Sequence, residues 1–452
     1  MWLWAVAMLA YAVIAAAPTR TRASQTCPCS SPALCQPISV THAREVFGFS
    51  VSNDTSYDRY DWDQLTTVAW NEDPALMCAA HAAGARVVID GRSANPVAVY
   101  GNRTARAAWV AEQVQHAVEA HLDGINFDLE APILPGDPLA LEYSALVAEA
   151  AAAFHAAIPG SQVSVDVPWS PYGVDDRHYD WAGLAEATDL LFVMAYDTQS
   201  QIWGRCVASA NSPLALVQRG LQQWLQLGAP RSKLVLGLPW YGYKYPCVNS
   251  GFAGQHDLCE LSPVPFFGAP CSDAAGQQVC FSDIAAMTSA AGGDSQGPSF
   301  KFTGTGAVGS RALSATQPGK WITEQQHSLH HQQQLEVEVE QGSGAALACH
   351  VRYDAQQESP YANCRRTSDA AGSYSHQIWF DDPASIRLKC QLATELGLRG
   401  VGVWNLDCLD YQCVDPACSH ATMAMWAALQ AFQASVTPAH QTPEVQHYSV
   451  FA

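Results

Sequence analysis

The segment Asp123-Gly-Ile-Asn-Phe-Asp-Leu-Glu130 alternates apolar with polar residues, and this alternation predicts a β-strand. Side chains two apart on a strand project to the same side, so Asn126, Asp128 and Glu130 would share one face. Carboxyl groups about 6.6 Å apart along a strand interact electrostatically. Such coupling can keep one of them protonated, which general acid catalysis requires. The alternative is a strand end whose acids only face solvent.

Outward from this segment, strand-like and helix-like patterns alternate along the chain. Seven further apolar segments are typical of strands, namely residues 45–51, 65–70, 85–90, 162–168, 189–197, 233–241 and 398–404. Helical patterns lie between or after them at residues 74–83, 104–122, 139–157, 180–188, 213–227, 385–396 and 423–432. Eight strands alternating with helices predict an α/β fold, the (β/α)8 TIM barrel.

The side chains that could take part in catalysis or binding cluster where these strands end. They are Glu130, Trp169, Tyr196, Asp197, Trp240, Tyr241, Trp404 and Asn405. TIM barrels place their sites at the carboxyl ends of the strands. Flat aromatic faces beside hydrogen-bonding acids suit pyranose rings, which present C–H faces and hydroxyl edges. The pattern favours a carbohydrate site, although each aromatic residue taken singly could simply pack at the barrel rim.

The spacing of the strands predicts an insertion into the barrel. About 155 residues separate the seventh and eighth strands, far more than one βα loop needs. We therefore expect barrel segments at 24–243 and 385–434, with an inserted subdomain at 244–384. Within it, residues 289–344 are rich in Gly, Ser, Gln and His, which predicts a mobile polar excursion. Metal binding by its histidines is the less favoured interpretation. Residues 435–452 are expected to be a disordered tail.

The amino-terminal segment and the cysteines indicate the secretory pathway. Residues 1–23 begin with an apolar run and end in small residues, which predicts a cleaved signal peptide and no membrane anchor afterwards. Fifteen cysteines favour an oxidising compartment, and their odd number leaves at least one free thiol or intermolecular link. Paired Cys-x-x-Cys sets typical of zinc sites are missing. Asn53-Asp-Thr55 and Asn102-Arg-Thr104 are potential N-glycosylation sites. Both the lysosome (or vacuole) and the exterior remain open as destinations.

The overall charge restricts the class of ligand. A formal net charge of −19 and a pI near 5.1 argue against nucleic acid and anionic membranes as partners. A neutral or cationic ligand is easier to accommodate. We expect the chain to act as a monomer on such a ligand.

Several motifs resemble those of family 18 glycoside hydrolases, the chitinase family. The segment 123–130 resembles the Asp-x-x-Asp-x-Asp-x-Glu signature of that family. Met194-Ala-Tyr-Asp197 is similar to its Met-x-Tyr-Asp segment, and Pro239-Trp-Tyr-Gly242 to its seventh-strand motif. Trp404 is placed like the family tryptophan that floors the subsite of the cleaved sugar. The second acid of the signature is Asn126 here, so the usual proton relay is altered. We expect this change to favour ionised Asp128 and to adapt the site to low pH.

Further segments resemble one lysosomal branch of the family, which cleaves the β-1,4 linkage of di-N-acetylchitobiose at the reducing end of N-glycan-derived oligosaccharides. These segments are Cys27-Pro-Cys29, Phe192-Val-Met-Ala-Tyr-Asp-Thr-Gln-Ser-Gln-Ile-Trp203, Pro239-Trp-Tyr-Gly-Tyr243, Gly268-Ala-Pro-Cys-Ser-Asp-Ala-Ala-Gly276, His376-Gln-Ile-Trp379 and Cys408-Leu-Asp-Tyr411. The resemblance covers most of the chain from Cys27 to about Trp426.

This resemblance implies substrate-assisted retaining hydrolysis, with Glu130 as proton donor, Asp128 orienting the acetamido N–H and Tyr196 holding the acetamido oxygen. It places Trp404 under the sugar, with Asp197 and Asn405 as hydroxyl partners. Asn126, Trp169, Trp240 and Tyr241 complete the expected substrate-binding set. No metal or organic cofactor is expected. The alternatives are a secreted chitinase acting on polymeric chitin and a non-catalytic lectin that binds chitin or GlcNAc.

Overall fold

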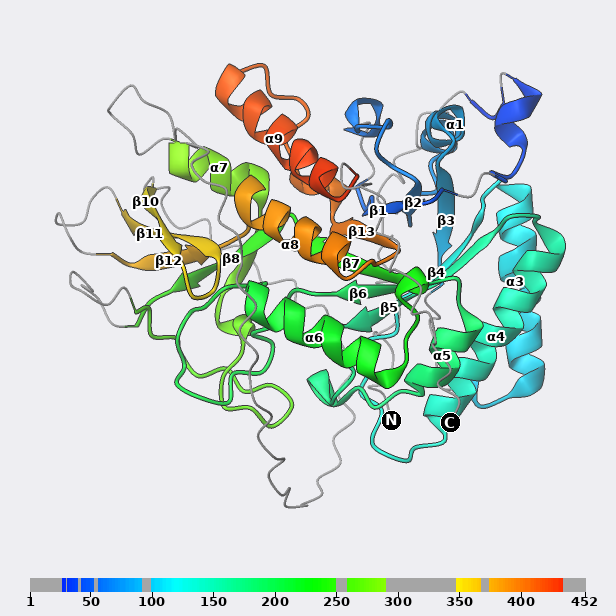
Figure 1. Cartoon of the computed structure of the whole chain (residues 1–452), viewed down its shortest axis with the longest axis horizontal. Helices are drawn as coiled ribbons and strands as arrows, with labels where there is room; N and C mark the ends of the chain where they lie inside the picture. The colour runs from blue at the N-terminus through cyan, green and yellow to red at the C-terminus, as the bar shows by residue number, and fades with distance from the viewer. Residues whose placement is uncertain are drawn as a thin grey trace, which may run out of the picture.

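Eight parallel strands close into a barrel in the order β1-β13-β7-β6-β5-β4-β3-β2 (Figure 1). The computed structural model describes residues 27–29, 31–39, 42–52, 56–91, 99–248, 258–289, 347–366 and 374–433. The barrel strands are β1 (Glu45–Phe49), β2 (Thr67–Ala69), β3 (Arg86–Asp90), β4 (Gly124–Phe127), β5 (Gln162–Pro168), β6 (Leu190–Met194), β7 (Leu234–Pro239) and β13 (Gly400–Trp404). The predicted TIM barrel is therefore confirmed. Its first and last strands pair in parallel, Glu45 beside Gly400, and this pairing closes the ring.

The predicted helices form the outer layer of the barrel. They are α1 (Pro74–Ala83), α3 (Arg103–Glu119), α4 (Leu139–Ala157), α5 (Trp181–Ala187), α6 (Leu214–Leu227), α8 (Pro383–Glu395) and α9 (Pro416–Gln433). Their ends follow local chemistry. Asp73 caps α1 by accepting the N–H of Ala75 at 2.8 Å, and Gly84, at φ 77°, ends it in the left-handed conformation that glycine adopts without strain. Asn102 of the second potential glycosylation site caps α3 in the same way.

Aromatic side chains fill the barrel interior beneath its carboxyl end. Phe49 packs edge-on against Phe192 at 5.0 Å and lies 5.1 Å from Trp404, measured between ring centroids. Phe192 needs the space left by glycines on two neighbouring strands. A Cβ atom would approach its ring to 2.6 Å from Gly237 and 2.5 Å from Gly402. The interior is thus a packed floor, and the cavity described below lies above it.

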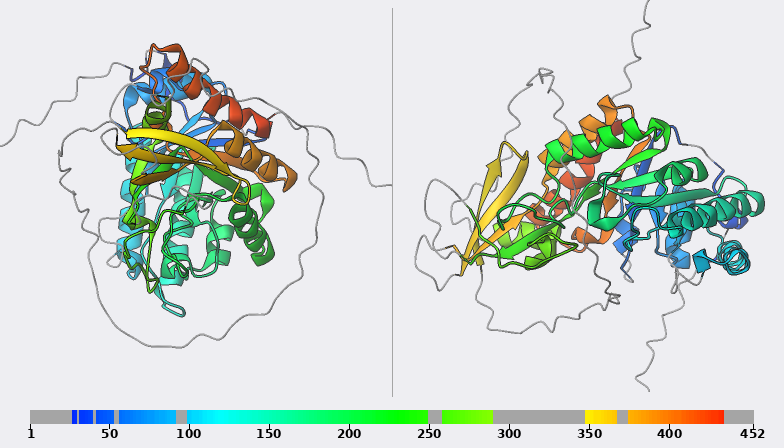
Figure 2. Two further views of the ribbon diagram at one scale, coloured as in Figure 1. Left: turned by 90° about the vertical axis from the view of Figure 1, so that its left-hand side faces the viewer. Right: turned by 90° about the horizontal axis from the view of Figure 1, so that it is seen from below.

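The insertion between β7 and β13 builds a second, antiparallel sheet in the order β10-β11-β12-β8-β9. Its elements are β8 (Tyr241–Pro246), β9 (Gln277–Cys280), α7 (Phe281–Ser289), β10 (Leu347–Asp354), β11 (Ser359–Arg366) and β12 (His376–Trp379). The strand predicted over 233–241 divides at Trp240. The backbone N–H of Trp240 donates to the Trp404 carbonyl of the barrel, and the Trp240 carbonyl accepts the N–H of Phe281 in the insertion. Figures 1 and 2 show this sheet at one end of the molecule and α3 with α4 at the other.

Seven disulfides use fourteen of the fifteen cysteines, and Cys390 is the free, buried one. Of the two expected outcomes of the odd number, a free thiol or an intermolecular link, the structure has the free thiol. The pairs are Cys27–Cys78, Cys29–Cys35, Cys206–Cys271, Cys247–Cys259, Cys280–Cys408, Cys349–Cys364 and Cys413–Cys418. Cys206–Cys271 and Cys280–Cys408 join the insertion to loops of the barrel.

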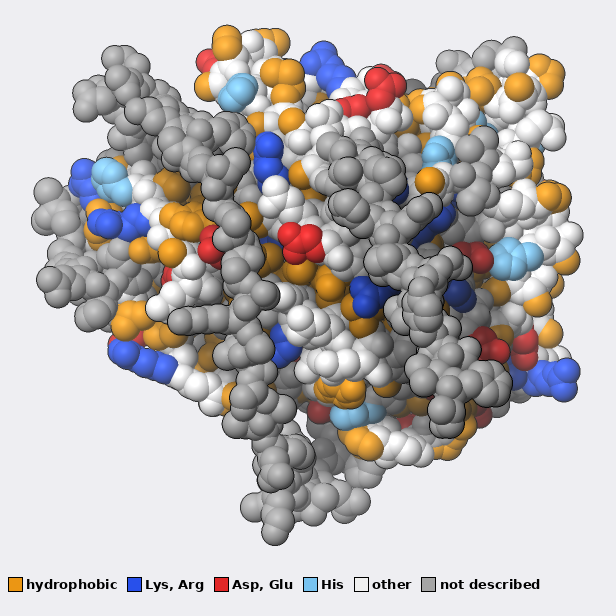
Figure 3. Space-filling view, in the orientation of Figure 1, with side chains coloured by type: hydrophobic (Ala, Val, Ile, Leu, Met, Phe, Trp, Pro, Cys, Tyr) orange, Lys and Arg blue, Asp and Glu red, His pale blue; other side chains and the backbone are white. Residues whose placement is uncertain are grey.

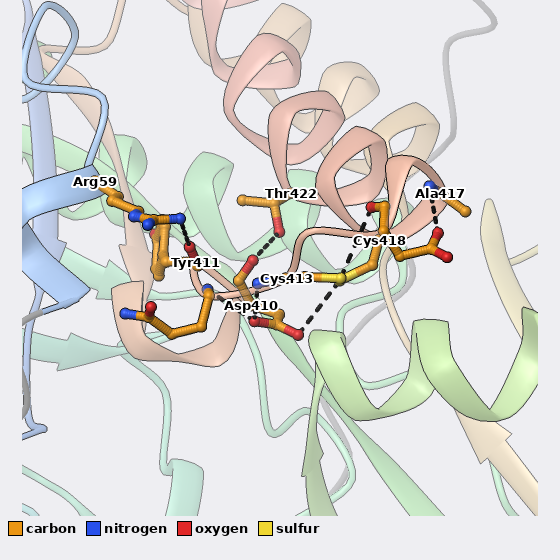
Figure 4. Close-up of a disulfide and its surroundings, with 9 residues drawn as sticks. Arg59, Asp410, Tyr411, Cys413, Ala417, Cys418 and Thr422 are labelled. Atoms are coloured by element: carbon orange, nitrogen blue, oxygen red, sulfur yellow. Dashed lines mark hydrogen bonds between the residues drawn. A yellow bond between two sulfur atoms is a disulfide. The ribbon is translucent and has the colours of Figure 1, made fainter.

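The Cys413–Cys418 bridge lies where the chain enters α9 (Figure 4). There Asp410 accepts the N–H of Cys413 at 2.9 Å, and its carbonyl accepts the hydroxyl of Thr422 at 3.0 Å. Among the described residues, two clusters contain the residue types that bind metal ions, Cys29, Cys35 and His121 in one and Asp410, Cys413 and Cys418 in the other. In each cluster the two cysteines form a disulfide.

Several expectations fall outside the described residues: the signal peptide at 1–23, the glycosylation site at Asn53, nearly all of the excursion at 289–344 and the tail at 435–452. Among the helices that are described, none combines the length and apolar character needed to cross a bilayer. On the face shown in Figure 3, acidic and basic side chains are interspersed among hydrophobic and neutral ones.

Candidate active site

The two carboxylates of the motif lie just beyond the strand that was expected to carry them. β4 ends at Phe127, so Asp128 and Glu130 occupy the loop at its carboxyl end. The prediction of a strand reaching Glu130 is wrong at this end, because the pairing of β4 with β3 extends only to Asn126. Because both acids lie beyond the paired part of β4, their side chains can reach the space above the barrel.

A cavity of about 280 Å³ opens above the barrel floor and contains both acids. Its lining residues are Asp128, Glu130, Asp166, Pro168, Trp169, Val174, Asp175, Arg177, Met194, Tyr196, Asp197, Ser200, Tyr243, Phe266, Asp273, Gln278 and Trp404. Six of the residues chosen from the sequence are among them. The half-buried rings of Trp169 and Trp404 supply flat apolar faces to its wall.

Four residues proposed from the sequence do not line this cavity. Trp240 is fully buried and packs edge-on against Trp426 at 5.0 Å. The Asn405 side chain turns back to accept the N–H of Asp407 at 3.1 Å. Tyr241 is buried and acts through its hydroxyl, which donates to Asp197. Asn126 lies one layer below, inside the barrel. Trp240 and Asn405 thus occupy packing and capping positions.

Asn126 connects the motif to a carboxyl group that the sequence analysis did not single out. Its amide nitrogen donates to Asp166 at 2.9 Å and to Ser164 at 3.0 Å, both on β5, and its oxygen accepts from Trp70 at 2.9 Å. An amide can serve both kinds of partner at once, which a carboxylate could not. The amide at position 126 therefore does not leave Asp128 without a neighbouring acid, because Asp166 supplies one from β5.

Burial governs the ionisation of this inner layer. It raises the pKa of Asp166 well above its ordinary value, the charge of Asp128 adds to the rise, and the Asn126 hydrogen bond opposes it. Burial likewise raises the pKa of Tyr196 well above the usual range, so its hydroxyl stays protonated and can donate. The floor of the cavity therefore offers hydrogen-bond donors beside Asp128.

Arg177 is the cation of the cavity, and it faces Glu130. Its Nη2 atom donates to Glu130 Oε2 at 2.5 Å and lies 3.3 Å from Asp175 Oδ2. The guanidinium is largely buried, whereas 43% of the Glu130 side chain remains exposed. Asp175 and Asp176, at φ 54° and 55°, hold left-handed conformations that are unusual outside glycine. These two residues directly precede Arg177, and such conformations are often found at functional sites.

A second cluster on the cavity wall combines the barrel with the insertion. The Tyr243 hydroxyl donates to Asp197 Oδ1 at 3.0 Å, and the Tyr241 hydroxyl donates to the same oxygen. Gln278 donates to the Tyr243 oxygen at 2.9 Å. Asp273 of the insertion lines the same cavity, and its charge helps to raise the pKa of Tyr243, which burial raises most.

The chemistry of the cavity follows from its composition. Six carboxyl groups and one guanidinium line it, with aromatic rings on its wall. Those carboxyl groups that are ionised would stabilise positive charge developing on a bound sugar. The exposed Glu130 is placed to exchange a proton with a ligand. Such an arrangement is typical of a glycosidase in a TIM barrel.

Comparison with known proteins agrees with this class. Residues 42–408 match the family model "Glycosyl hydrolases family 18". The chain therefore belongs to that family of glycosidases. Di-N-acetylchitobiase of Rattus norvegicus is 39% identical over 409 residues, which cover 90% of this chain and 93% of the rat protein. The protein of the same name from Homo sapiens is 37% identical, with 91% and 90% covered.

Solved chitinase structures share the fold. A class V chitinase from Nicotiana tobaccum superimposes with a TM-score of 0.56 at 16% identity, covering 85% of this chain and 99% of that one. A group IV chitinase from Ostrinia furnacalis, solved with allosamidin, gives a TM-score of 0.58 at 15% identity, with 86% and 99% covered. At this identity the likeness shows the shared fold alone.

Proposed function

We propose that this protein hydrolyses the β-1,4 linkage of di-N-acetylchitobiose at the reducing end of N-glycan-derived oligosaccharides. The observation that carries the proposal is the overlap of two findings. Relatives named di-N-acetylchitobiase match about nine-tenths of the chain, and Asp128, Glu130 and Tyr196 line one cavity. We infer an oxidising destination reached through the secretory pathway, the lysosome (or vacuole) or the exterior, which the seven disulfides support.

Glu130 would donate a proton to the glycosidic oxygen from the exposed side of the cavity. As that bond breaks, the 2-acetamido oxygen of the same sugar attacks the anomeric carbon and forms an oxazolinium ion. This is a recognised exception to a protein nucleophile. Water then attacks the anomeric carbon while Glu130 takes back a proton, and the configuration is retained.

The groups beneath the sugar would stabilise this intermediate. Asp128 is placed to accept the acetamido N–H and to balance the positive charge. Tyr196, kept protonated by burial, would donate to the acetamido oxygen. Trp404 and Trp169 present their faces to the sugar ring. Burial raises the pKa of Asp166 below them, which disfavours a second negative charge in competition with Asp128.

A polymer-degrading chitinase and a non-catalytic lectin are the alternatives that the experiment must separate. Wild type and Glu130→Gln are assayed on di-N-acetylchitobiose and on colloidal chitin. The proposal expects rapid cleavage of the disaccharide, slow action on chitin, and a loss of about 10³-fold in kcat for the variant. Preferential release of soluble sugars from chitin would favour the polymer chitinase. Equal inactivity of both proteins, with sugar binding retained, would favour the lectin.

A further inference from the structure

Three loops at the carboxyl end of the barrel are joined by a line of side-chain contacts that ends on Glu130. Ser200, in the loop after β6, donates its hydroxyl to Asp175 Oδ1 at 2.8 Å. The other oxygen of Asp175, Oδ2, accepts from Arg177 Nη2 at 3.3 Å. The same Nη2 atom donates to Glu130 Oε2 at 2.5 Å. One guanidinium is therefore shared between two carboxyl groups, and one of these belongs to the expected proton donor.

Backbone pairing holds the loops of Arg177 and Glu130 side by side. The N–H of Ile133 donates to the Asp176 carbonyl at 3.0 Å, and the N–H of His178 donates to the Ile133 carbonyl at 3.0 Å. These two bonds flank position 177 in the sequence, which pairs with Ile133 as a parallel bridge. The guanidinium is thus held beside Glu130 by the backbone as well as by charge.

The two carboxyl groups that share Arg177 differ in burial and in partners. The side chain of Asp175 is 7% exposed, whereas that of Glu130 is 43% exposed. Both oxygens of Asp175 accept hydrogen bonds, one from a hydroxyl and one from a cation, as an ionised carboxylate does. Burial raises the pKa of Asp175, and the charge of Arg177 and the Ser200 hydroxyl oppose the rise. Asp175 is therefore the buried, fully bonded partner of the cation, and Glu130 is the partner open to a ligand.

Other titratable groups also face Glu130 from the surrounding elements. They are Asp128 on the same loop, Asp166 on β5, Tyr179 in the loop after β5, and Tyr196 and Asp197 after β6. All of them remain in place when only position 175 is changed. A difference between wild type and a variant of Asp175 therefore reports on Asp175 and on Arg177.

We propose that Asp175 is a positioning residue of the reaction, which acts as the permanent counter-ion of Arg177. In the proposed mechanism Glu130 gives its proton to the glycosidic oxygen and later takes one from water, so its charge alternates. A buried cation left without an anion is strongly disfavoured. Asp175 compensates Arg177 while Glu130 is protonated, and the guanidinium stays beside the proton donor throughout the cycle. The inference rests on the proposed function, because it takes Glu130 to be that donor.

Asp175→Asn removes the charge with little change of shape. The amide oxygen can accept from Arg177 and the amide nitrogen can donate to Ser200, so both contacts can persist. Asparagine also tolerates the left-handed conformation at this position, φ 54°. Without the second anion, Arg177 favours ionised Glu130, which cannot donate a proton. We expect kcat/KM on di-N-acetylchitobiose to begin its fall toward high pH about one unit lower than in wild type. At acidic pH it should change by less than about threefold.

Two further variants sharpen this test. Asp176→Asn is the matched control, since Asp176 has the same backbone conformation, φ 55°, but does not line the cavity, and its profile should be that of wild type. Ser200→Ala weakens the carboxylate of Asp175 from its other side, so its profile should shift in the same direction by about 0.3 unit. A loss of equal size at every pH in Asp175→Asn, or a shift toward high pH in either variant, would overturn the inference.

A second measurement needs no turnover. Protein labelled with ¹³C at the glutamate side-chain carboxyl gives a Glu130 signal in NMR spectra, identified by its loss in Glu130→Gln. The pH at which this signal moves should be about one unit lower in Asp175→Asn than in wild type. Coincident titrations would overturn the inference. The expected difference in a protein that cleaves no GlcNAc linkage would instead refute the proposed function and leave the pairing of Asp175 with Arg177 standing.

Discussion

The eight-residue motif carries acids at both of its ends, and the two ends have opposite roles. Asp123, before β4, is fully buried and accepts hydrogen from Ile38 N at 2.8 Å, Val87 N at 2.8 Å and His81 Nε2 at 2.9 Å. Glu130, after the strand, is 43% exposed at its side chain and pairs with Arg177. A carboxylate thus fastens the barrel at one end of the motif and faces the cavity at the other.

This difference shows how a parallel strand separates stability from chemistry. At the amino end, Asp123 joins β4 to β3, to α1 through His81 and to the amino-terminal segment through Ile38. All of its partners are fixed, so it has no capacity left for a ligand. At the carboxyl end the ladder stops, and the side chains that follow are free of it. Mutations at the two ends should therefore affect different properties.

The largest expected effect is on catalysis, from Glu130→Gln. The amide keeps the shape of the side chain but cannot donate the proton, so kcat should fall by about 10³-fold, equivalent to about 4 kcal/mol, with the midpoint of thermal unfolding unchanged. Kinetics on di-N-acetylchitobiose and thermal melts check this. Glu112→Gln, on the exposed face of α3, is the control and should leave both properties as they are. A large fall in the melting temperature of Glu130→Gln would break the comparison.

Asp123→Asn should give the converse result. It breaks a buried, hydrogen-bonded pair with His81 and should lower the free energy of unfolding by about 3 kcal/mol, because breaking such a pair leaves polar groups unmatched. The specific activity of the folded protein should remain that of the wild type.

Asp189 before β6 is a matched control for Asp123, since it accepts hydrogen from His155 at 2.9 Å and from Val163 N at 2.7 Å in the same arrangement. Its side chain is 39% exposed, so Asp189→Asn should cost less than about 1 kcal/mol. Denaturant titrations compare the two. Equal losses would show that burial does not distinguish these sites.

Arg177→Met should reduce kcat about tenfold with a smaller change in KM. The guanidinium holds the Glu130 carboxyl in place, and its loss would let the proton donor leave the reactive position. Arg177→Lys should restore part of the loss. Arg205→Met is the control, because its pair with Glu260 is exposed and should contribute little. An effect confined to KM would instead indicate that Arg177 contacts the sugar directly.

The smallest effect concerns pH. Burial lowers the pKa of His81, but the hydrogen bond and charge of Asp123 outweigh it, and the net shift is upward from 6.5. Both ring nitrogens face acceptors, Asp123 and the Leu34 carbonyl, which suits the imidazolium form. This stabilisation is complete below the unfolded value near 6.5 and is lost as pH rises through the folded one. We expect about 1 kcal/mol of difference, measured as unfolding free energy of wild type minus His81→Gln from pH 5 to 9. A difference that grows with pH would contradict this sign.

Much of the fold could be predicted because the sequence patterns of strands and helices are local. The strand and helix segments follow from apolar runs, and helix ends such as those of α1 follow from Asp73 and Gly84. The exact ends of strands could not be predicted, because they depend on where neighbouring strands stop pairing, as at Asn126 and Trp240.

Site residues in motifs at strand ends could be predicted from the sequence. Those that only tertiary contacts bring to the cavity were missed. Asp166 belongs to an apolar run whose inward face also holds Ser164, and the lone acid in that run was the available signal. Arg177 follows two residues with positive φ, and Asp273 lies two residues after the Cys206–Cys271 disulfide. No periodicity reveals such contacts, so the cation beside Glu130 and the acid from the insertion emerge only from the structure.

The anomeric configuration of the sugar first released from di-N-acetylchitobiose tests the central claim most directly. Proton NMR recorded within the first minutes of hydrolysis distinguishes the two anomers of the newly formed reducing end before they equilibrate. With Glu130 as proton donor and the acetamido group as nucleophile, the new reducing end should appear as the β-anomer. Its appearance as the α-anomer, or no release of GlcNAc at any pH, would contradict the account.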